Sequence, residues 1–131
     1  MLSTVWRGTD LDRDEPVAIK CESDGFHEPE QVRRHFRQEL RWFRHFADTP
    51  TPGSLVHFVD GSIDDERSYV VTELIRGGSL AGRFDGDRTP GLGAFRSLGG
   101  PICRTIAFLH DNGVVHRDVK PTNVLDRRRG P

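Results

Sequence analysis

The sequence predicts an α+β fold, with a small antiparallel sheet and one helix followed by a mainly helical second part. Four short runs rich in β-branched and aromatic residues are separated by polar turns and predict strands at 4–7, 16–21, 55–59 and 68–72. The first two flank the charged turn 10–15, and the last two flank the acidic turn 64–66. Each pair is therefore expected to form a hairpin.

A helix is predicted between residues 30 and 47, after the loop 23–29. Its apolar residues recur at spacings of four, four and three: Val32, Phe36, Leu40 and Phe43. The run Thr-Pro-Thr-Pro-Gly at 49–53 ends it, because proline cannot continue a helix and glycine favours a turn.

The character of the sequence changes after Glu73. Residues 76–80 contain Gly-Gly and predict a flexible joint, and 82–93 reads as irregular. A second helix is predicted over 94–110, weakened in its middle by Gly99, Gly100 and Pro101 but periodic at Ile102, Ile106 and Leu109. A further strand is expected at 124–125 and a turn from 126 onward. The implied domain division is 1–72, a joint at 73–80, and 81–131.

Composition restricts the class of protein. The 131 residues carry a net charge of −1, which excludes a global field that would recruit nucleic acid or an acidic membrane. Cys21 and Cys103 form no disulfide framework or metal-binding spacing, so a reducing cytosol is expected. No run reaches the length of a membrane span, and the histidines show no convergent metal spacing.

The octapeptide His-Arg-Asp-Val-Lys-Pro-Thr-Asn, residues 116–123, carries the clearest chemical signal. Phosphoryl transfer needs a carboxylate near the acceptor hydroxyl, a cation on the moving phosphate and an oxygen ligand for magnesium. Asp118, Lys120 and Asn123 offer these three groups within one short loop. The alternative is a polar solvated turn.

Glu39 falls on the apolar face of its helix, where an unpaired carboxylate is costly. Its candidate partner is Lys20, the last residue of the run Val-Ala-Ile-Lys at 17–20. The alternative is that Lys20 extends to solvent from an edge strand and that Glu39 lies at the rim of the apolar stripe.

These motifs resemble those of Ser/Thr protein kinases: residues 116–123 the catalytic loop, Val17–Lys20 the third-strand lysine motif, and Glu39 the helix-C glutamate. The resemblance implies a kinase N-lobe, with its antiparallel sheet and helix C, joined to the first part of the helical C-lobe. It implies ATP and Mg²⁺ as cofactors and a protein hydroxyl as acceptor. Asp118 would be the base, Lys120 would contact the γ-phosphate and Asn123 would bind magnesium. Lys20 would hold the α- and β-phosphates.

By the same resemblance, residues 72–75 are the hinge that binds adenine. Thr72 would be the gatekeeper, Glu73 would offer its carbonyl, and Ile75 its N–H and carbonyl. The side chains expected to cover the adenine faces are Val5, Ala18 and Leu125, which read equally well as core residues. Further implied features are a Phe43–Phe58 stack beside His116 and an anchor for a phosphorylated activation loop at Arg117.

The resemblance covers part of a kinase domain, from just after the Gly-rich loop to just after the catalytic loop. The 131 residues contain no Asp-Phe-Gly, the motif whose aspartate is a principal magnesium ligand. Residues 1–131 alone are therefore expected to be inactive, with Ile102, Ile106 and Leu109 left as an exposed patch. The alternatives are a pseudokinase-like nucleotide-binding or interaction module, a non-functional gene fragment, and a small-molecule phosphotransferase of the same fold.

Overall fold

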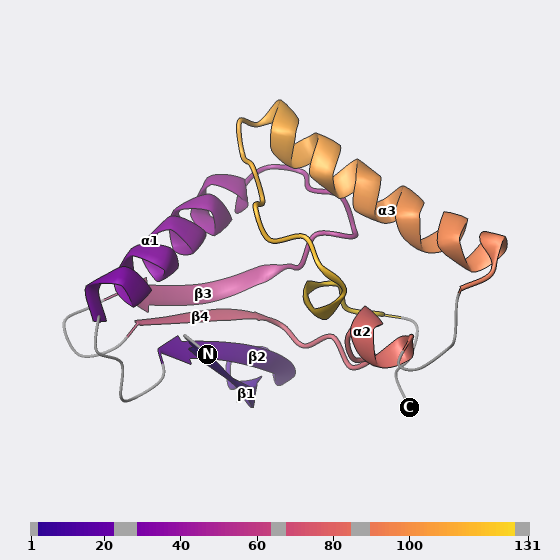
Figure 1. Ribbon diagram of the computed structural model, residues 1–131. Helices are drawn as coiled ribbons and strands as arrows, with labels where there is room; N and C mark the ends of the chain where they lie inside the picture. The colour runs from indigo at the N-terminus through magenta and orange to yellow at the C-terminus, as the bar shows by residue number, and fades with distance from the viewer. Residues whose placement is uncertain (1–2, 23–28, 64–67, 85–89, 128–131) are drawn as a thin grey trace. The chain divides into compact units, whose positions relative to one another are not determined.

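The computed structural model describes residues 3–22, 29–63, 68–84 and 90–127 (Figure 1). Its contacts divide the chain into two compact units. The first comprises Met1–Pro50 and Val56–Leu74, and the second comprises Thr51–Leu55 and Ile75–Pro131. Residues 23–28 of the predicted loop 23–29, and the predicted turn 64–66, lie outside the described residues.

The first unit contains a sheet with the order β1-β2-β4-β3, in which all neighbouring strands are antiparallel. The strands are β1 (Ser3–Asp10), β2 (Glu15–Glu22), β3 (Phe58–Ile63) and β4 (Ser68–Glu73). The predicted α+β class with an antiparallel sheet is confirmed.

The third strand was placed wrongly by sequence. It starts at Phe58 rather than Leu55, because Leu55 belongs to a turn in which its N–H donates to the Pro52 carbonyl at 2.9 Å. The strand then extends to Ile63, with a register shift between Phe58 and Asp60. The β-branched run therefore predicted the strand itself but not its ends.

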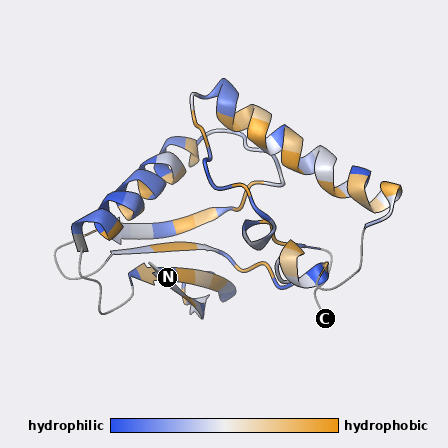
Figure 2. Cartoon of the chain, viewed as in Figure 1, coloured by the Kyte–Doolittle hydropathy of each residue, from blue (hydrophilic) through white to orange (hydrophobic). Residues whose placement is uncertain are grey.

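Helix α1 (Pro29–Phe46) covers the sheet of the first unit through a small core. Val32, Phe36 and Val70 are at most 2% exposed and pack together, and Phe43, Phe58 and Ile63 lie around them. The remaining surface of α1 is strongly hydrophilic (Figure 2). The predicted apolar stripe is therefore the face that packs on the sheet.

Gly61 allows α1 to approach β3 closely. A Cβ at this position would lie 2.7 Å from Leu40 Cδ1 and 3.0 Å from the Tyr69 carbonyl oxygen. The absence of a side chain here lets Leu40 reach the sheet, where it is 3% exposed.

The described part of the second unit contains α2 (Leu80–Arg83), α3 (Leu92–Asp111) and the 3₁₀ turn η1 (Pro121–Asn123). Helix α3 continues through Pro101, and the segment 82–93, predicted as irregular, contains the end of α2 and the start of α3. The predicted strand at 124–125 is instead a single bridge between Leu125 and Ser79.

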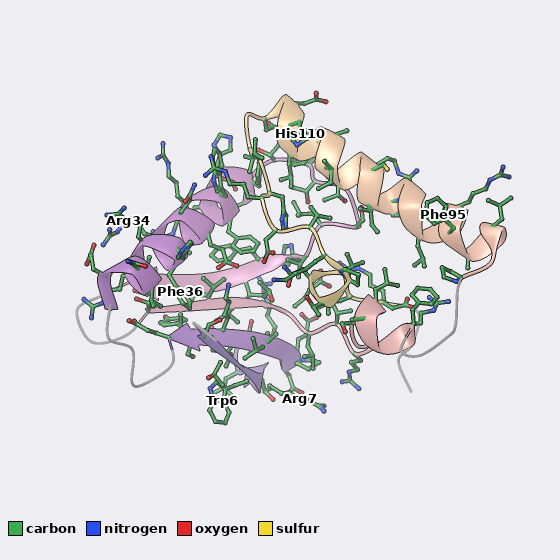
Figure 3. The ribbon with its side chains drawn as sticks, viewed as in Figure 1. Trp6, Arg7, Arg34, Phe36, Phe95 and His110 are labelled. Atoms are coloured by element: carbon green, nitrogen blue, oxygen red, sulfur yellow. The ribbon has the colours of Figure 1, made fainter. Side chains whose placement is uncertain are left out.

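The exposed apolar patch on α3 is not formed by the residues predicted for it, Ile102, Ile106 and Leu109. Leu109 is buried at 5% exposure, and Ile102 and Ile106 are half-buried. The exposed apolar side chains of this helix are Leu92, 67% exposed, and Phe95, 63% exposed, near its N-terminal end (Figure 3). The periodic stripe is thus largely covered, and the predicted exposed patch is wrong. Among the described residues, no helix is both long and apolar enough to cross a bilayer.

Candidate functional site

The Lys20 ammonium and the Glu39 carboxylate form the expected ion pair. Lys20 Nζ on β2 lies 2.7 Å from Glu39 Oε2 on α1, and 5.4 Å from the centroid of the Phe36 ring. Strand β2 lies between β1 and β4, so the interpretation of Lys20 as an edge-strand residue is wrong. The side chains are 37% and 33% exposed, so Glu39 lies at the rim of the apolar stripe and the pair is open to solvent on one side.

Strand register places four predicted site residues on one face of the sheet. Ala18 and Lys20 are two residues apart on β2, so their side chains point to the same face of the sheet. Lys20 is opposite Val5 on β1, and Ala18 is opposite Thr72 on β4. Directly opposed residues point to the same side of a sheet, so all four side chains belong to the face that α1 covers in part.

Glu73 is fixed to His57 through two hydrogen bonds that sequence reasoning missed. The Glu73 N–H donates to the His57 carbonyl at 2.9 Å, and the His57 N–H donates to Glu73 Oε1 at 2.7 Å. The Thr72 hydroxyl donates weakly to the Glu73 carbonyl at 3.4 Å. Both the main chain and the side chain of Glu73, the last residue of β4, are therefore bound to His57. Ile75 belongs to the second unit, where it is half-buried.

In the second unit, the loop 116–123 converges on Asp118. Lys120 Nζ lies 3.0 Å from Asp118 Oδ1, and Asn123 Nδ2 donates to Asp118 Oδ2 and to its carbonyl, both at 2.9 Å. The Asp118 N–H donates to His116 Nδ1 at 3.3 Å. Arg117 has a φ of 63°, a left-handed conformation that reverses the chain beside Asp118. The three residues predicted from the motif are thus brought together.

The surroundings of Asp118 favour its ionised form. Hydrogen bonds from Lys120 and then from Asn123 lower the pKa of the Asp118 carboxyl below its ordinary value of 3.8. The loop is exposed, so the carboxylate also faces solvent. A persistent anion at this position can receive a hydrogen bond from an incoming hydroxyl.

The donor types in this loop fit magnesium, which prefers oxygen ligands. The Asn123 amide nitrogen is used toward Asp118, which leaves its Oδ1 as an oxygen donor. Within residues 3–22, 29–63, 68–84 and 90–127, no three His, Cys, Asp or Glu side chains converge into a metal site.

An ion pair between Arg83 and Asp126 was not predicted. Arg83 Nη1 lies 2.6 Å from Asp126 Oδ2, and the aspartate side chain is only 5% exposed. The Leu80 N–H donates to the Val124 carbonyl and the Asp126 N–H to the Gly78 carbonyl. The residue predicted to start a turn is therefore buried, and this pairing positions the neighbouring Leu125, which is 48% exposed. Two opposite charges 43 residues apart gave no local signal in the sequence.

The predicted stack of Phe43 on Phe58 is present, with ring centroids 5.3 Å apart and planes inclined by 14°. Both rings belong to the first unit and His116 to the second. The rings therefore form part of the contact between α1 and β3.

The fold, the Lys20–Glu39 pair and the loop centred on Asp118 are together typical of protein kinase domains. The model of the protein kinase domain matches residues 1–130, and the chain belongs to this family. The similar proteins described next are Ser/Thr kinases.

The serine/threonine-protein kinase PknL of Mycobacterium tuberculosis is 35% identical over 125 residues, covering 94% of this chain and 30% of that kinase. Ribosomal protein S6 kinase 2 alpha of Gallus gallus is 42% identical over 96 residues, covering 73% of this chain and 12% of the relative. The chain thus spans less than a third of the length of these relatives.

Among solved structures, Rad53 residues 1–466 in complex with AMP-PNP is similar in fold, with a TM-score of 0.76 and 24% identity. The alignment covers 97% of this chain and 32% of that chain. The predicted kinase fold is confirmed.

Proposed function

We propose that the protein containing this chain transfers the γ-phosphoryl group of ATP to serine or threonine hydroxyls of a protein substrate. The observation that carries the proposal is the convergence of Lys120 and Asn123 on the Asp118 carboxylate at 3.0 and 2.9 Å. Ser/Thr kinase relatives and the nucleotide analogue in the complex with Rad53 support the same chemistry.

In this proposal, Asp118 orients the acceptor hydroxyl and takes its proton on a carboxylate oxygen. Its low pKa suits orientation, because the group is fully ionised at neutral pH and stays a hydrogen-bond acceptor. Lys120, which pairs with Asp118 in this structure, contacts the γ-phosphate. Asn123 binds magnesium through Oδ1. A magnesium ion held by Asn123 would offset the negative charge that develops on the phosphates.

On the first unit, Lys20 contacts the α- and β-phosphates and Glu39 keeps its ammonium in place. The adenine is held by main-chain groups of Glu73 and Ile75, with Thr72 as gatekeeper. The adenine faces are covered by Val5, Ala18 and Leu125. The hydrogen bonds between Glu73 and His57 support this assignment, because they fix the peptide that would meet the base.

The acceptor class is tested with the full-length protein, ATP, Mg²⁺ and matched peptides that differ only in a Ser, Thr or Tyr acceptor. Phosphate is expected on the Ser and Thr peptides. Phosphate on the Tyr peptide alone would contradict the acceptor assignment. ATP binding without transfer to any peptide would favour a nucleotide-binding module.

A further inference from the structure

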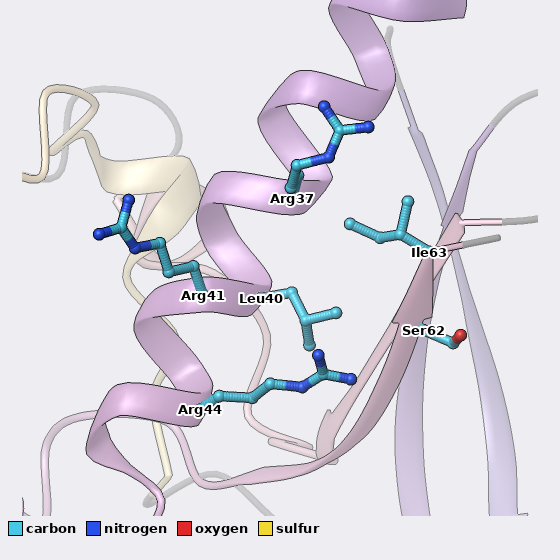
Figure 4. A pocket seen from close by; sticks show the side chains of 6 residues that line it. All are labelled: Arg37, Leu40, Arg41, Arg44, Ser62 and Ile63. Carbon is cyan, nitrogen blue, oxygen red and sulfur yellow. The ribbon is translucent and has the colours of Figure 1, made fainter.

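Arg83 differs from several arginines of α1 in where its charge is used. The arginines that line a hollow between α1 and β3 are all exposed: Arg37, Arg41 and Arg44 (Figure 4). The side chain of Arg83 is only 25% exposed, and its Nη1 lies 2.6 Å from Oδ2 of Asp126. Its Cζ also lies 5.6 Å from the centroid of the Phe84 ring. The charge of Arg83 is therefore used within the second unit, against a carboxylate whose side chain is 5% exposed.

This ion pair lies beside a main-chain connection between residues 78–80 and residues 124–126. The two segments are joined by N–H···O bonds of 2.7 and 3.0 Å, one on each side of the antiparallel bridge at Leu125. Arg83 comes three residues after the first segment, and its side chain reaches Asp126 in the second. The two segments are therefore joined twice, by their main chains and by a pair of opposite charges.

Both segments adjoin residues that the proposed function assigns to the nucleotide. Residues 78–80 begin three positions after Ile75, whose main chain would bind adenine. Residues 124–126 follow Asn123 directly and include Leu125, which would cover the adenine. Leu125 is 48% exposed, so packing alone does not fix its side chain. Its position depends instead on the bonds made by the residues before and after it.

Net stability is a weak reason for such a pair, because the cost of taking two charges out of water offsets much of their attraction. The pair does supply direction. A guanidinium donates from a planar group, so a carboxylate meets it at a restricted distance and angle. The Asp126 carboxylate is also too enclosed to turn toward water unless residues 124–126 move. Arg83 therefore restricts the position of the segment that contains Leu125.

We propose that Arg83 is a positioning residue of the nucleotide site. Through Asp126 it holds Leu125 where this side chain meets the adenine, and Arg83 itself does not touch the nucleotide. The inference rests on the proposed function, from which it takes the role of Leu125. It concerns binding of the base and not transfer of phosphate, so the affinity for adenosine should depend on Arg83 as strongly as the affinity for ATP.

The test is isothermal titration calorimetry of the full-length protein, with ATP plus Mg²⁺ and with adenosine as separate ligands. Arg83→Met should weaken binding of both by the same factor, at least about fivefold, as expected for coupling through a residue that does not touch the ligand. Arg83→Lys keeps the charge and should weaken both less. Lys20→Met changes the phosphate side and should weaken ATP alone. Arg104→Met, at an exposed position on α3, should leave both affinities unchanged.

A double variant keeps the test independent of folding. Arg83→Met/Asp126→Leu removes both charges, so no buried carboxylate is left without Arg83, and the thermal midpoint should return at least to that of the wild type. The affinity for adenosine should stay low, because the directed contact is still missing. If adenosine affinity recovers together with the midpoint, the ion pair is only structural and the inference is overturned. Unchanged adenosine binding in Arg83→Met overturns it as well.

Failure of this inference is distinct from failure of the proposed function. Phosphate transfer by the wild type, with equal nucleotide affinity in every Arg83 variant, would overturn the role of Arg83 alone. If the wild type binds both ligands without transferring phosphate, the proposed transfer fails, and the affinities of the variants still decide the role of Arg83. A wild type that binds neither ligand would overturn both.

Discussion

Lys20 Nζ on β2 and Glu39 Oε2 on α1 are joined at 2.7 Å, and about a third of each side chain remains exposed. An ion pair with this exposure contributes little to stability, at most about 1 kcal/mol. The geometry therefore favours a functional role, in which Glu39 holds the ammonium at a fixed point on the sheet face shared with Ala18 and Thr72.

Glu39→Gln should consequently separate stability from function. The free energy of unfolding is expected to change by at most about 1 kcal/mol, while the KM for ATP of the full-length protein rises. The control is Glu30→Gln on the same helix, whose pair with Arg37 at 3.8 Å is exposed on both sides. Equal ATP kinetics in the two variants would remove Glu39 from the nucleotide site.

The pKa of Asp118 tests the loop geometry directly. Lys120→Met and Asn123→Ala should each raise the Asp118 pKa toward 3.8, with the larger change in Lys120→Met because Lys120 is the principal cause of the shift. Thr122→Ala, in the same turn, is the control. The measurement is a carboxyl ¹³C titration by NMR, and an unchanged pKa in both variants would contradict the described hydrogen bonds.

The lowered pKa of Asp118 also determines how the contribution of this carboxyl group to stability changes with pH. The folded pKa is depressed, so this contribution is present above the unfolded value and is lost as the pH falls through the folded value. The thermal midpoints of wild type and Lys120→Met should therefore differ more at pH 7 than in strong acid, after comparison with Thr122→Ala at each pH. A difference that grows as the pH falls would contradict the assignment.

Arg83→Ala should loosen the segment around Leu125. It leaves the 5% exposed Asp126 carboxylate without this partner, which costs about 2–4 kcal/mol since Arg83 itself remains partly hydrated. The Leu80 and Asp126 N–H groups, which bond across this segment, should then exchange faster with solvent. Amide hydrogen exchange measures this, with Arg104→Ala as the control. Unchanged protection would show that the ion pair does not support the segment.

Gly61→Ala should destabilise the first unit by about 1–3 kcal/mol, because the added methyl would overlap Leu40 Cδ1 and approach the backbone oxygen of Tyr69. Urea unfolding followed by Trp42 fluorescence measures the change. The control is Gly53→Ala, where the new methyl meets nothing within 4 Å. Equal midpoints for the two variants would show that the packing of α1 on β3 is not close at this position.

Sequence predicted the parts of this molecule that depend on local periodicity. The spacing of Val32, Phe36 and Leu40 predicted α1 and its packing face, and the run 17–20 predicted β2. The pairing of Lys20 with Glu39 followed from the cost of an unpaired carboxylate near a core. The motif at 116–123 likewise predicted that Asp118, Lys120 and Asn123 act together, and these side chains lie within hydrogen-bonding distance of Asp118.

The features that sequence did not predict depend on contacts between distant residues. The hydrogen bonds between His57 and Glu73 join the residue before β3 to the last residue of β4, and the buried Asp126 pairs with Arg83 of α2, 43 residues earlier. Helix α3 passes through Pro101, although proline lacks the N–H for one helical hydrogen bond. The assignment of individual residues to ATP, magnesium and substrate stays a prediction.

The central claim is that Asp118 is the base in phosphoryl transfer from ATP to a protein hydroxyl. The most direct measurement is transfer of radiolabelled phosphate from ATP with Mg²⁺ by the full-length protein, comparing wild type with Asp118→Asn. The account predicts transfer to Ser or Thr by the wild type and a turnover lower by on the order of 10² or more in the variant, with ATP binding retained. Near-normal transfer by Asp118→Asn, or no transfer by the wild type, would contradict it.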